Sequence, residues 1–521
     1  MEYTLGIDLG TTGVKVLLVS REGVVVSSGV AEYPLLIPRL NWAEQNPEQW
    51  WEATVAAIAG CLEKVPASTG GKIEVSAIGL SGQMHGSVFL DDNGKVLRPA
   101  ILWCDQRTEE QCQRITEIIG FDRLIALTSN KAVAGFTAPK ILWLRKYEPD
   151  TYARVRKILL PKDYIRYRLT GTFATEVSDA SGTLLLNVRE RKWSTEVLDA
   201  LDIPRDWLPD CFESPVVSSY LSKEVAHIVG LPAGIPIVGG AGDQAAGAVG
   251  NGIVRAGMAS CALGTSGVIF WHSDDPYYDP QGRLHSFCHA VPGKWHLMGV
   301  TLAAGGSLRW FRDSLCEDIK AEAKRDEIDP YVIIDRVAEE IQDGSEGLLF
   351  LPYLAGERTP YTDADARGAF LGLSLRHTRA HMARSVMEGV TMSLKDCMEL
   401  GRSMALDAAV LHMSGGGARS NFWQQMVADV MGVNVVTVGI DEGPAYGAAI
   451  LAAVGCGFHA SVEQACNTLV HVKDVKVPRG RQSQDYENLY KVYHRLYREL
   501  IEFHKRDAEF MRHVSGKSPV E

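Results

Sequence analysis

The chain lacks the sequence features that mark several classes of protein. Its ten cysteines include no Cys-x-x-Cys pair, so neither a zinc ribbon nor a thioredoxin-like redox pair is expected. No basic segment followed by an apolar one stands at the N-terminus, which predicts no secretory signal and a cytoplasmic location. The one long uncharged stretch, Pro444–Val462, has an apolar core well short of the ~20 residues of a membrane span, so we expect a buried helix there.

The chain also lacks an excess of positive charge. Its formal net charge is −11, which disfavours a sequence-independent nucleic-acid binder, because such binding depends on cationic groups. Hydrophobic residues make up 46% and charged residues 22%, as in ordinary folded proteins. A length of 521 residues is enough for roughly two to four domains. We therefore expect small-molecule partners, no nucleic acid and no membrane, and a homodimer is compatible with the sequence.

A short repeated element predicts two similar domains. The segment Leu9–Val14 reads Leu-Gly-Thr-Thr-Gly-Val, and Leu263–Val268, about half the chain later, differs from it only by Ser for the second Thr. Apolar runs on both sides of each segment predict a strand, a tight turn and a second strand. We expect one domain over residues 1–252 and another over 253–521, with the seam at the glycine-rich segment Gly250–Gly257.

Strands and helices are expected to alternate along the chain, which is typical of the α/β class. The predicted strands are Leu5–Asp8, Val14–Val19, Ile73–Leu80, Ile235–Gly239, Val268–Trp271, Leu348–Leu351 and Val410–Ser414. The predicted helices are Pro47–Cys61, Ala138–Lys146, Gln244–Val249, His381–Leu400, the stretch after Pro444, and Gln484–His513, which should pack on the second domain.

Three glycine-rich turns could bind phosphate, because glycine lets backbone N–H groups approach an anion closely. They are Gly10–Gly13, Gly264–Gly267 and Gly415–Gly417, and plain hairpin turns remain an alternative for the first two. Asp8 favours the phosphate-binding interpretation, because an acid at the end of an apolar strand is costly to bury without a cation or hydrogen-bond donors. A carboxylate beside a phosphate loop is where Mg²⁺ would be held.

Two familiar nucleotide motifs are not present. The Gly-Lys-Ser sequence at Gly516–Ser518 has Met511 where the first glycine of a P-loop belongs. The segment Gly240–Ala245 resembles a dinucleotide fingerprint, but no acidic residue that could hold a ribose occurs between Asp243 and Asp274. We therefore expect neither a P-loop nor a Rossmann site.

Four polar or aromatic residues allow a structural and a functional interpretation. Asp243 could be a helix N-cap or a general base. His85 could be a structural histidine, although Gly82 and Gly86 would let its loop approach a small ligand, and no neighbouring His or Cys suggests zinc. Trp103 could be a core residue or lie against a sugar. Arg107 is expected to be a solvated surface charge.

Eight motifs along nearly the whole chain resemble the FGGY family of carbohydrate kinases, within the actin-like ATPase superfamily, and most closely its xylulokinase members. The resemblance implies two similar actin-like, ribonuclease H-like α/β domains flanking a cleft. The motifs are Gly6–Thr12, Gly82–Gly86, Leu102–Arg107, Gly135–Trp143, Gly242–Ala248, Gly356–Pro360, Gly415–Asn421 and Gly443–Ala449.

The resemblance also implies ATP-dependent phosphorylation of D-xylulose to D-xylulose 5-phosphate, with Mg²⁺. By position, Asp243 is the general base, and Asp8 and Asp243 are the carboxylates beside the metal. Gln83, Met84 and His85 form the sugar loop, with Trp103 and Asp105 completing the sugar pocket. The implied nucleotide contacts are Thr11, Thr12, Gly264, Thr265, Ser266, Gly305, Gly416, Gly417 and Asn421.

Three points about this resemblance remain open. Cys104 stands where related sequences often carry Asn, so a polar role at that position is in doubt. Another ketose or polyol of the same family, such as ribulose, is an alternative substrate, whereas Gln83-Met84-His85 argues against glycerol, because glycerol kinases typically have Gln-Arg-Glu there. A non-catalytic sugar-sensing ATPase is a further alternative, disfavoured by Asp243.

Overall fold

The computed structural model describes residues 2–440 and 442–514 except for 67–72, so the Gly-Lys-Ser sequence at Gly516–Ser518 lies outside the described residues. The chain forms two compact units. Unit 1 comprises Met1–Ala256, His272–Leu297 and Glu442–His471, and unit 2 comprises Gly257–Trp271, Met298–Asp441 and Val472–Glu521. Both units are therefore assembled from separate stretches of chain, and the division between residues 252 and 253 stays a prediction.

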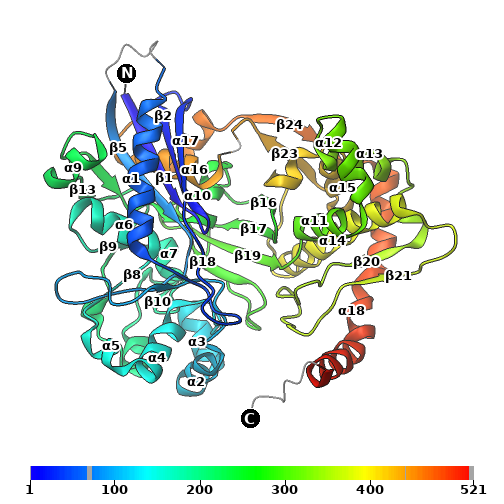
Figure 1. The fold of residues 1–521 in the computed structure, drawn as a ribbon, viewed down its shortest axis with the longest axis horizontal. Helices are drawn as coiled ribbons and strands as arrows, with labels where there is room; N and C mark the ends of the chain where they lie inside the picture. The colour runs from blue at the N-terminus through cyan, green and yellow to red at the C-terminus, as the bar shows by residue number, and fades with distance from the viewer. Residues whose placement is uncertain (1, 67–72, 441, 515–521) are drawn as a thin grey trace. The chain divides into compact units, whose positions relative to one another are not determined.

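The two large sheets repeat one topology, which confirms the two similar α/β domains expected from the repeated turn (Figure 1). The first sheet has the strand order β3-β2-β1-β5-β14-β13, with β15 also paired to β5. The second has the order β18-β19-β17-β16-β22-β23-β24, in which the six strands from β19 to β24 correspond to the order of the first. In both, a hairpin of antiparallel strands, β1 with β2 or β16 with β17, continues into a parallel neighbour, β5 or β22. The last strand of each order, β13 or β24, is again antiparallel.

The regular elements of unit 1 confirm the expected strands and helices of the first half of the chain. Its strands are β1 (Glu2–Leu9), β2 (Gly13–Ser20), β3 (Val25–Glu32), β4 (Glu44–Gln45), β5 (Glu74–Gly82), β6 (Val88–Leu90), β7 (Ala100–Ile101), β8 (Lys157–Leu159), β9 (Ala174–Glu176), β10 (Leu186–Asn187), β11 (Lys192–Trp193), β12 (Asp210–Phe212), β13 (Val217–Tyr220), β14 (Pro236–Val238), β15 (Ala241–Gly242) and β18 (His285–Cys288). Its helices are α1 (Pro47–Glu63), α2 (Glu109–Ile119), α3 (Phe121–Thr128), α4 (Thr137–Tyr147), α5 (Pro149–Arg154), α6 (Pro161–Thr170), α7 (Val177–Ser181), α8 (Thr195–Ala200), η2 (Arg205–Trp207), α9 (Lys223–Val229), α10 (Asp243–Gly250), α16 (Gly443–Gly455) and α17 (Val462–Leu469).

The strands and helices expected around the second sheet are likewise present, together with others, such as α11, α13 and α15, that were not predicted. The strands are β16 (Met258–Leu263), β17 (Gly267–Ser273), β19 (Trp295–Thr301), β20 (Leu349–Leu351), β21 (Ala369–Leu371), β22 (Val410–Ser414), β23 (Asn434–Val438) and β24 (Val472–Lys476). The helices are α11 (Gly305–Leu315), α12 (Glu317–Arg325), α13 (Pro330–Glu339), η3 (Ser345–Gly347), α14 (Arg379–Arg402), η4 (Gly416–Arg419), α15 (Asn421–Met431) and α18 (Gly480–Val514).

The uncharged stretch forms the buried helix α16, which packs on β1, β5 and α10 within unit 1. The packing is unusually close, because a Cβ atom at Gly79 would lie 1.9 Å from the Ala448 carbonyl oxygen, and one at Gly447 would lie 1.8 Å from the Ala246 carbonyl oxygen. Glycine is therefore required where α16 crosses β5 and α10. Among the described residues, no helix has the length and apolar character needed to cross a membrane.

The C-terminal helix α18 packs on α14 in unit 2, as its helical pattern of tyrosines predicts. Tyr490 donates a hydrogen bond from its hydroxyl to Asp396 at 2.7 Å, and the Tyr493 hydroxyl donates to the Gly389 carbonyl at 3.1 Å. Both tyrosines are buried, and their polar ends find partners on α14. Helix α18 thus completes the core of unit 2.

Candidate functional site

The two repeated turns are closed by similar backbone hydrogen bonds. In the first turn the Gly10 N–H donates to the Gly13 carbonyl at 3.0 Å, and in the second the Gly264 N–H donates to the Ser266 carbonyl at 3.0 Å. The second turn also lies against the start of α11, where the Gly305 N–H donates to the Gly264 carbonyl at 2.8 Å. A helix N-terminus beside a glycine turn is a favourable surrounding for phosphate.

A cavity of about 440 Å³ in unit 2 opens beside this second turn. Five of the residues predicted to contact the nucleotide line it, whereas Ser266 and Asn421 do not belong to its lining. The lining also includes residues of α13 and α15 that were not predicted from the sequence. The five predicted residues are Gly264, Thr265, Gly305, Gly416 and Gly417, and the added ones include Tyr331, Val332, Asp335 and Trp423.

Asp335 is an acidic residue of the cavity lining, and the pKa of its carboxyl is shifted. Burial raises the pKa of its carboxyl to about 6, although the Ser420 hydroxyl opposes that shift. Ser420 itself caps α15 by accepting a hydrogen bond from the Trp423 N–H at 3.0 Å. No local sequence pattern indicates Asp335, because α13 (Pro330–Glu339) lies far in sequence from the glycine turns that line the same cavity.

The carboxylates of Asp8 and Asp243 both belong to unit 1 and affect each other. Asp8 is the next-to-last residue of β1 and pairs with Ser81 of β5, and its Oδ1 is buried with no hydrogen-bond partner among the described residues. Burial raises the pKa of Asp8 to about 6, against the opposing effects of Ser81 and Lys15. Burial, and then the negative charge of Asp8, raise the pKa of Asp243 to about 7. Two close acids held in a poorly solvated place favour a cation or a shared proton.

Asp243 is the first residue of α10, so the helix begins one residue before the predicted Gln244, and the N-cap interpretation of Asp243 is wrong. The N-cap position is Gly242, and no side chain caps this helix. A Cβ atom at Gly242 would lie 2.8 Å from the Met84 Cγ, so the sugar loop is packed directly against the residue that precedes Asp243. The structure thus brings Met84 and the start of α10 together.

The predicted sugar loop leaves the end of β5 and is held firmly. The Gln83 N–H donates to the Leu9 carbonyl at 2.8 Å, and the Gln83 side-chain amide donates to the Gln45 side chain at 2.9 Å. Met84 is buried, and His85 has a positive φ of 68°. The His85 ring stacks on Phe136 with 4.5 Å between ring centroids.

The hydrogen bond of the His85 ring defines its tautomer. Nδ1 lies 2.7 Å from the Gly182 carbonyl oxygen, and a carbonyl only accepts, so Nδ1 carries the proton. In the neutral imidazole Nε2 is then an acceptor. Gly182 was not predicted from the sequence, and a Cβ atom there would lie 2.5 Å from Nδ1. Glycine at this position is what lets the imidazole approach the turn after α7.

The segment around Trp103 agrees only partly with expectation. Trp103 is 39% exposed, and Asp105 is fully buried. Asp105 accepts hydrogen bonds from the Ala43 N–H and from the Arg107 guanidinium, so its contact with a sugar stays a prediction. The expectation of a solvated Arg107 is wrong, because its side chain is 1% exposed, paired with Asp105 and Glu44. Cys104 is half-buried.

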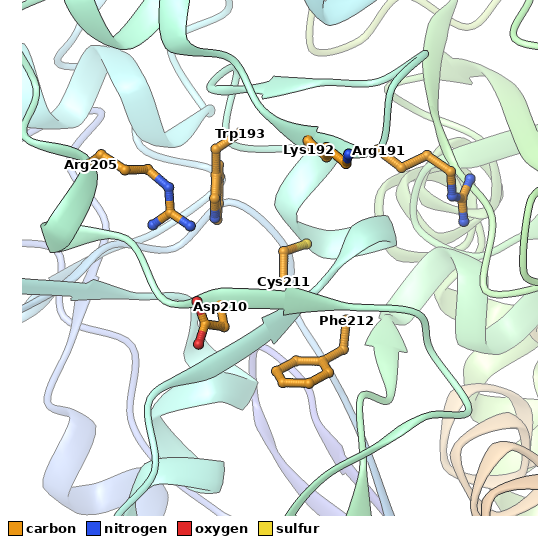
Figure 2. A pocket seen from close by; sticks show the side chains of 7 residues that line it. All are labelled: Arg191, Lys192, Trp193, Arg205, Asp210, Cys211 and Phe212. Carbon is orange, nitrogen blue, oxygen red and sulfur yellow. The ribbon is translucent and has the colours of Figure 1, made fainter.

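A second cavity, of about 540 Å³, lies in unit 1 and contains none of the predicted site residues (Figure 2). Its lining comes from β11, η2 and β12, and Figure 2 shows Trp193 and Arg205 on one side and Asp210 and Phe212 on the other. This cavity therefore shares no lining residue with the predicted sugar and nucleotide sites. The described residues contain no cluster of three or more His, Cys, Asp or Glu side chains able to hold a metal ion.

Comparison with known sequences covers nearly the whole chain. The N-terminal domain of the FGGY family of carbohydrate kinases matches residues 3–250, and the C-terminal domain of that family matches residues 259–456. Xylulose kinase of Bacillus subtilis (strain 168) is 39% identical over 497 residues, which are 95% of this chain and 97% of that protein. Xylulose kinase of Escherichia coli (strain K12) is 40% identical over 498 residues, covering 95% and 99%.

Solved structures give the same result for the fold. Ligand-bound xylulose kinase from Lactobacillus acidophilus is 27% identical, with a TM-score of 0.90 over 97% of this chain and 100% of that one. Xylulose kinase from Rhodospirillum rubrum is 29% identical, with a TM-score of 0.89 over 96% and 100%. The repeated sheets, the paired glycine turns and these matches agree: the chain belongs to the FGGY family of carbohydrate kinases and is a phosphotransferase.

Proposed function

We propose that the chain transfers the terminal phosphoryl group of ATP to the terminal hydroxyl of D-xylulose, giving D-xylulose 5-phosphate, with Asp243 as the general base. The observation that carries the proposal is the position of Asp243. It opens α10 next to Gly242, against which Met84 of the sugar loop packs, and its pKa is raised to about 7. A base with a pKa near the working pH is well matched to accept a hydroxyl proton.

Phosphoryl transfer through a loose transition state requires alignment and charge neutralisation more than a strong base. In this proposal Asp243 orients the sugar hydroxyl and accepts its proton late in the transfer. The hydroxyl oxygen forms the new P–O bond, the bond between the terminal phosphorus and the bridging oxygen of ATP breaks, and ADP leaves. A carboxylate is sufficient for this role.

The residues present fit a Mg²⁺ ion. The buried Oδ1 of Asp8 has no hydrogen-bond partner among the described residues, and the charge of Asp8 raises the pKa of Asp243, so a divalent cation would satisfy both carboxylates. Asp8 and Asp243 would hold the ion together with phosphate oxygens. When bound, Mg²⁺ supplies neutralisation of the negative charge of the phosphates.

Sugar recognition is assigned to the loop Gln83–His85 together with Trp103. The His85 ring donates from Nδ1 to the Gly182 carbonyl, so its Nε2 is suited to accept a hydrogen bond from a sugar hydroxyl. Met84 offers an apolar surface beside the start of α10. The partly exposed Trp103 indole is suited to the C–H face of a sugar.

Nucleotide binding is assigned to the cavity of unit 2. Gly264, Thr265, Gly305, Gly416 and Gly417 line the cavity of about 440 Å³, which is large enough for a nucleotide moiety. Thr11 and Thr12, Ser266 and Asn421 are further proposed contacts.

An ADP-release assay with purified enzyme, Mg-ATP and a panel of D-xylulose, D-ribulose, D-gluconate and glycerol tests the substrate. Gluconate belongs in the panel because gluconokinase of Bacillus subtilis (strain 168) is 32% identical over 98% of both chains. D-xylulose is expected to have the highest kcat/KM, and Asp243→Asn prepared in parallel reports contaminating kinases. A higher kcat/KM for another member of the panel would replace D-xylulose as the substrate.

A further inference from the structure

Lys140 is a fully buried lysine that the proposed reaction does not use. It lies on α4, and its side chain is 0% exposed. Its Nζ donates hydrogen bonds to two backbone carbonyls, that of His85 at 2.8 Å and that of Gly135 at 2.7 Å. Among the described residues Lys140 forms no ion pair, so its partners are these carbonyls rather than a carboxylate.

The carbonyl that Lys140 contacts belongs to the strained residue of the sugar loop. His85 has a φ of 68°, a left-handed conformation that a residue with a side chain adopts only when its surroundings hold it. The Thr137 hydroxyl donates to the same carbonyl at 3.1 Å, so both acceptor positions of the His85 carbonyl are occupied from the first turn of α4. The ring itself is fixed by Gly182 and by Phe136.

The number of N–H donors on Lys140 matches the two carbonyls that accept its hydrogen bonds. Burial lowers the pKa of Lys140 to about 7, although Asp105 and Cys104 oppose that shift. A neutral amine has two N–H groups, and two carbonyls accept them. Lys140 can thus act as a fixed double donor that ties the sugar loop to the turn before α4.

We propose that Lys140 is a positioning residue that holds His85 in its left-handed conformation, and so orients the imidazole and sets the affinity for the sugar without contacting the sugar. The inference rests on the proposed role of His85 in sugar binding. It adds a specificity-determining residue from α4, a helix that carries none of the residues assigned to the reaction.

The test is Lys140→Met, which keeps the length of the side chain and removes both donors. Its matched control is Lys146→Met, because Lys146 lies on the same helix but is exposed and paired with Glu110. Lys140→Met is expected to raise KM for the sugar by about ten-fold or more while KM for ATP stays within about two-fold, and Lys146→Met is expected to leave both unchanged. In a His85→Ala background, Lys140→Met should change the sugar KM by less than about two-fold, because the imidazole it positions is gone.

Three results would overturn the inference. The first is a sugar KM that rises as much in the His85→Ala background as in the wild type. The second is an equal rise of KM for sugar and ATP together with a lower Tm, which indicates a merely structural lysine. The third applies if Lys140→Met does not fold. Thr137→Val then serves as the test variant, because it removes the other donor to the His85 carbonyl, and an unchanged sugar KM in Thr137→Val would overturn the inference.

A separate readout distinguishes this inference from the proposed function. If the wild type phosphorylates no sugar of the panel, the proposed function fails, and hydrogen exchange of the loop decides the role of Lys140. The Gly86 N–H donates to the Met84 carbonyl at 2.9 Å and reports the order of the loop. Its exchange is expected to be at least about ten-fold faster in Lys140→Met than in Lys146→Met, and equal rates in the two variants overturn the inference.

Discussion

The indole N–H of Trp103 donates a hydrogen bond to the Thr11 hydroxyl at 3.0 Å, across 92 positions of sequence. Thr11 belongs to the first glycine turn, and Trp103 belongs to the segment assigned to the sugar pocket. The bond therefore connects the proposed phosphate contact and the proposed sugar contact inside unit 1. It also fixes one edge of an indole that is otherwise 39% exposed.

This bond predicts coupling between the two substrates. Trp103→Phe keeps an aromatic ring without the donor, and Thr11→Val keeps the shape of Thr without the acceptor. Each is expected to raise KM for both sugar and ATP several-fold, and the double variant is expected to be no worse than the poorer single one. A double-mutant cycle on kcat/KM should give a coupling of about 0.5–1.5 kcal/mol. Strictly additive effects would show that the two residues act independently.

Asp243→Asn is expected to lower kcat by about two to four orders of magnitude while KM for the sugar changes little, because the base is lost and the pocket shape is kept. With the wild type, kcat/KM should rise as pH increases through about 7, since the carboxylate must be ionised, and added Mg²⁺ should move this rise to lower pH. Steady-state kinetics from pH 5.5 to 8.5 at two Mg²⁺ concentrations check both effects. Turnover within a few fold of the wild type would remove Asp243 from the chemistry.

The same substitution has a predicted effect on stability. The raised pKa of Asp243 means that its ionised form is disfavoured in the folded state, so stability falls as pH rises from the ordinary pKa of 3.8, and the full cost is present above about pH 7. Asp243→Asn should therefore raise Tm at pH 8 without Mg²⁺. Thermal unfolding of both proteins at pH 8 measures this difference, and an unchanged or lower Tm of the variant would show that the ionised carboxylate does not destabilise the folded state.

Local patterns were sufficient to predict most of the elements around the site. Apolar runs of strand length flank each glycine turn, and the uncharged stretch after Pro444 predicted α16, because these signals lie within one segment. A helix directly after Gly242-Asp243 was predicted for the same reason, although α10 begins at Asp243 rather than at Gln244. These patterns do not indicate which distant segments fold into the same compact unit. His272–Leu297 and Glu442–His471, for example, both belong to unit 1.

The residues that sequence reasoning missed depend on distant partners. Arg107 is buried because β4 pairs with β7, which brings Glu44 next to the segment that follows β7. Its guanidinium also lies over the Trp42 ring, 3.6 Å from the centroid. Gly182 and Lys140 meet His85 across 97 and 55 positions of sequence. No local pattern predicts such contacts, although Lys140 stands inside a motif of the family resemblance.

Three buried histidines of unit 1 predict acid sensitivity. His272 and His289 have ring centroids 5.0 Å apart, and His289 and His296 are 5.7 Å apart. Burial lowers the pKa of all three, that of His296 to about 3. Each prefers to be neutral when folded and takes up a proton on unfolding below its ordinary pKa of about 6.5, so stability is lost as pH falls below that value.

His296→Gln removes one of these groups and should flatten the pH dependence. The wild type is expected to lose about 1 kcal/mol more than the variant between pH 6.5 and 5.5, since one differential proton is worth about 1.4 kcal/mol per pH unit. Urea unfolding of both proteins at pH 7.5, 6.5 and 5.5 measures the difference. If the unfolding free energy falls equally with pH in both proteins, His296 does not control acid stability. That conclusion holds even if His296→Gln lowers the unfolding free energy by the same amount at every pH.

A buried ionic cluster connected to Gly242 predicts a linked effect on stability and turnover. Lys162 is 0% exposed and lies 2.8 Å from Asp163, 3.1 Å from Asp179 and 3.4 Å from Glu176. Ser178 connects the cluster to the site, because its hydroxyl donates to Glu176 at 3.0 Å and accepts the Gly242 N–H at 3.1 Å.

Lys162→Met is expected to destabilise the protein by about 3–5 kcal/mol, because it leaves three buried carboxylates without this cation. Burial already raises the pKa of Asp179 well above its ordinary value, so Asp179 is the carboxylate whose charge is most costly. Adding Asp179→Asn to Lys162→Met should therefore restore part of the lost stability, and it should also restore part of kcat if Ser178 and Gly242 carry the disturbance to Asp243. Urea unfolding and kcat of both single variants and the double variant measure these quantities together. Recovery of stability without recovery of kcat would show that the cluster supports the fold of unit 1 but not the placement of Asp243.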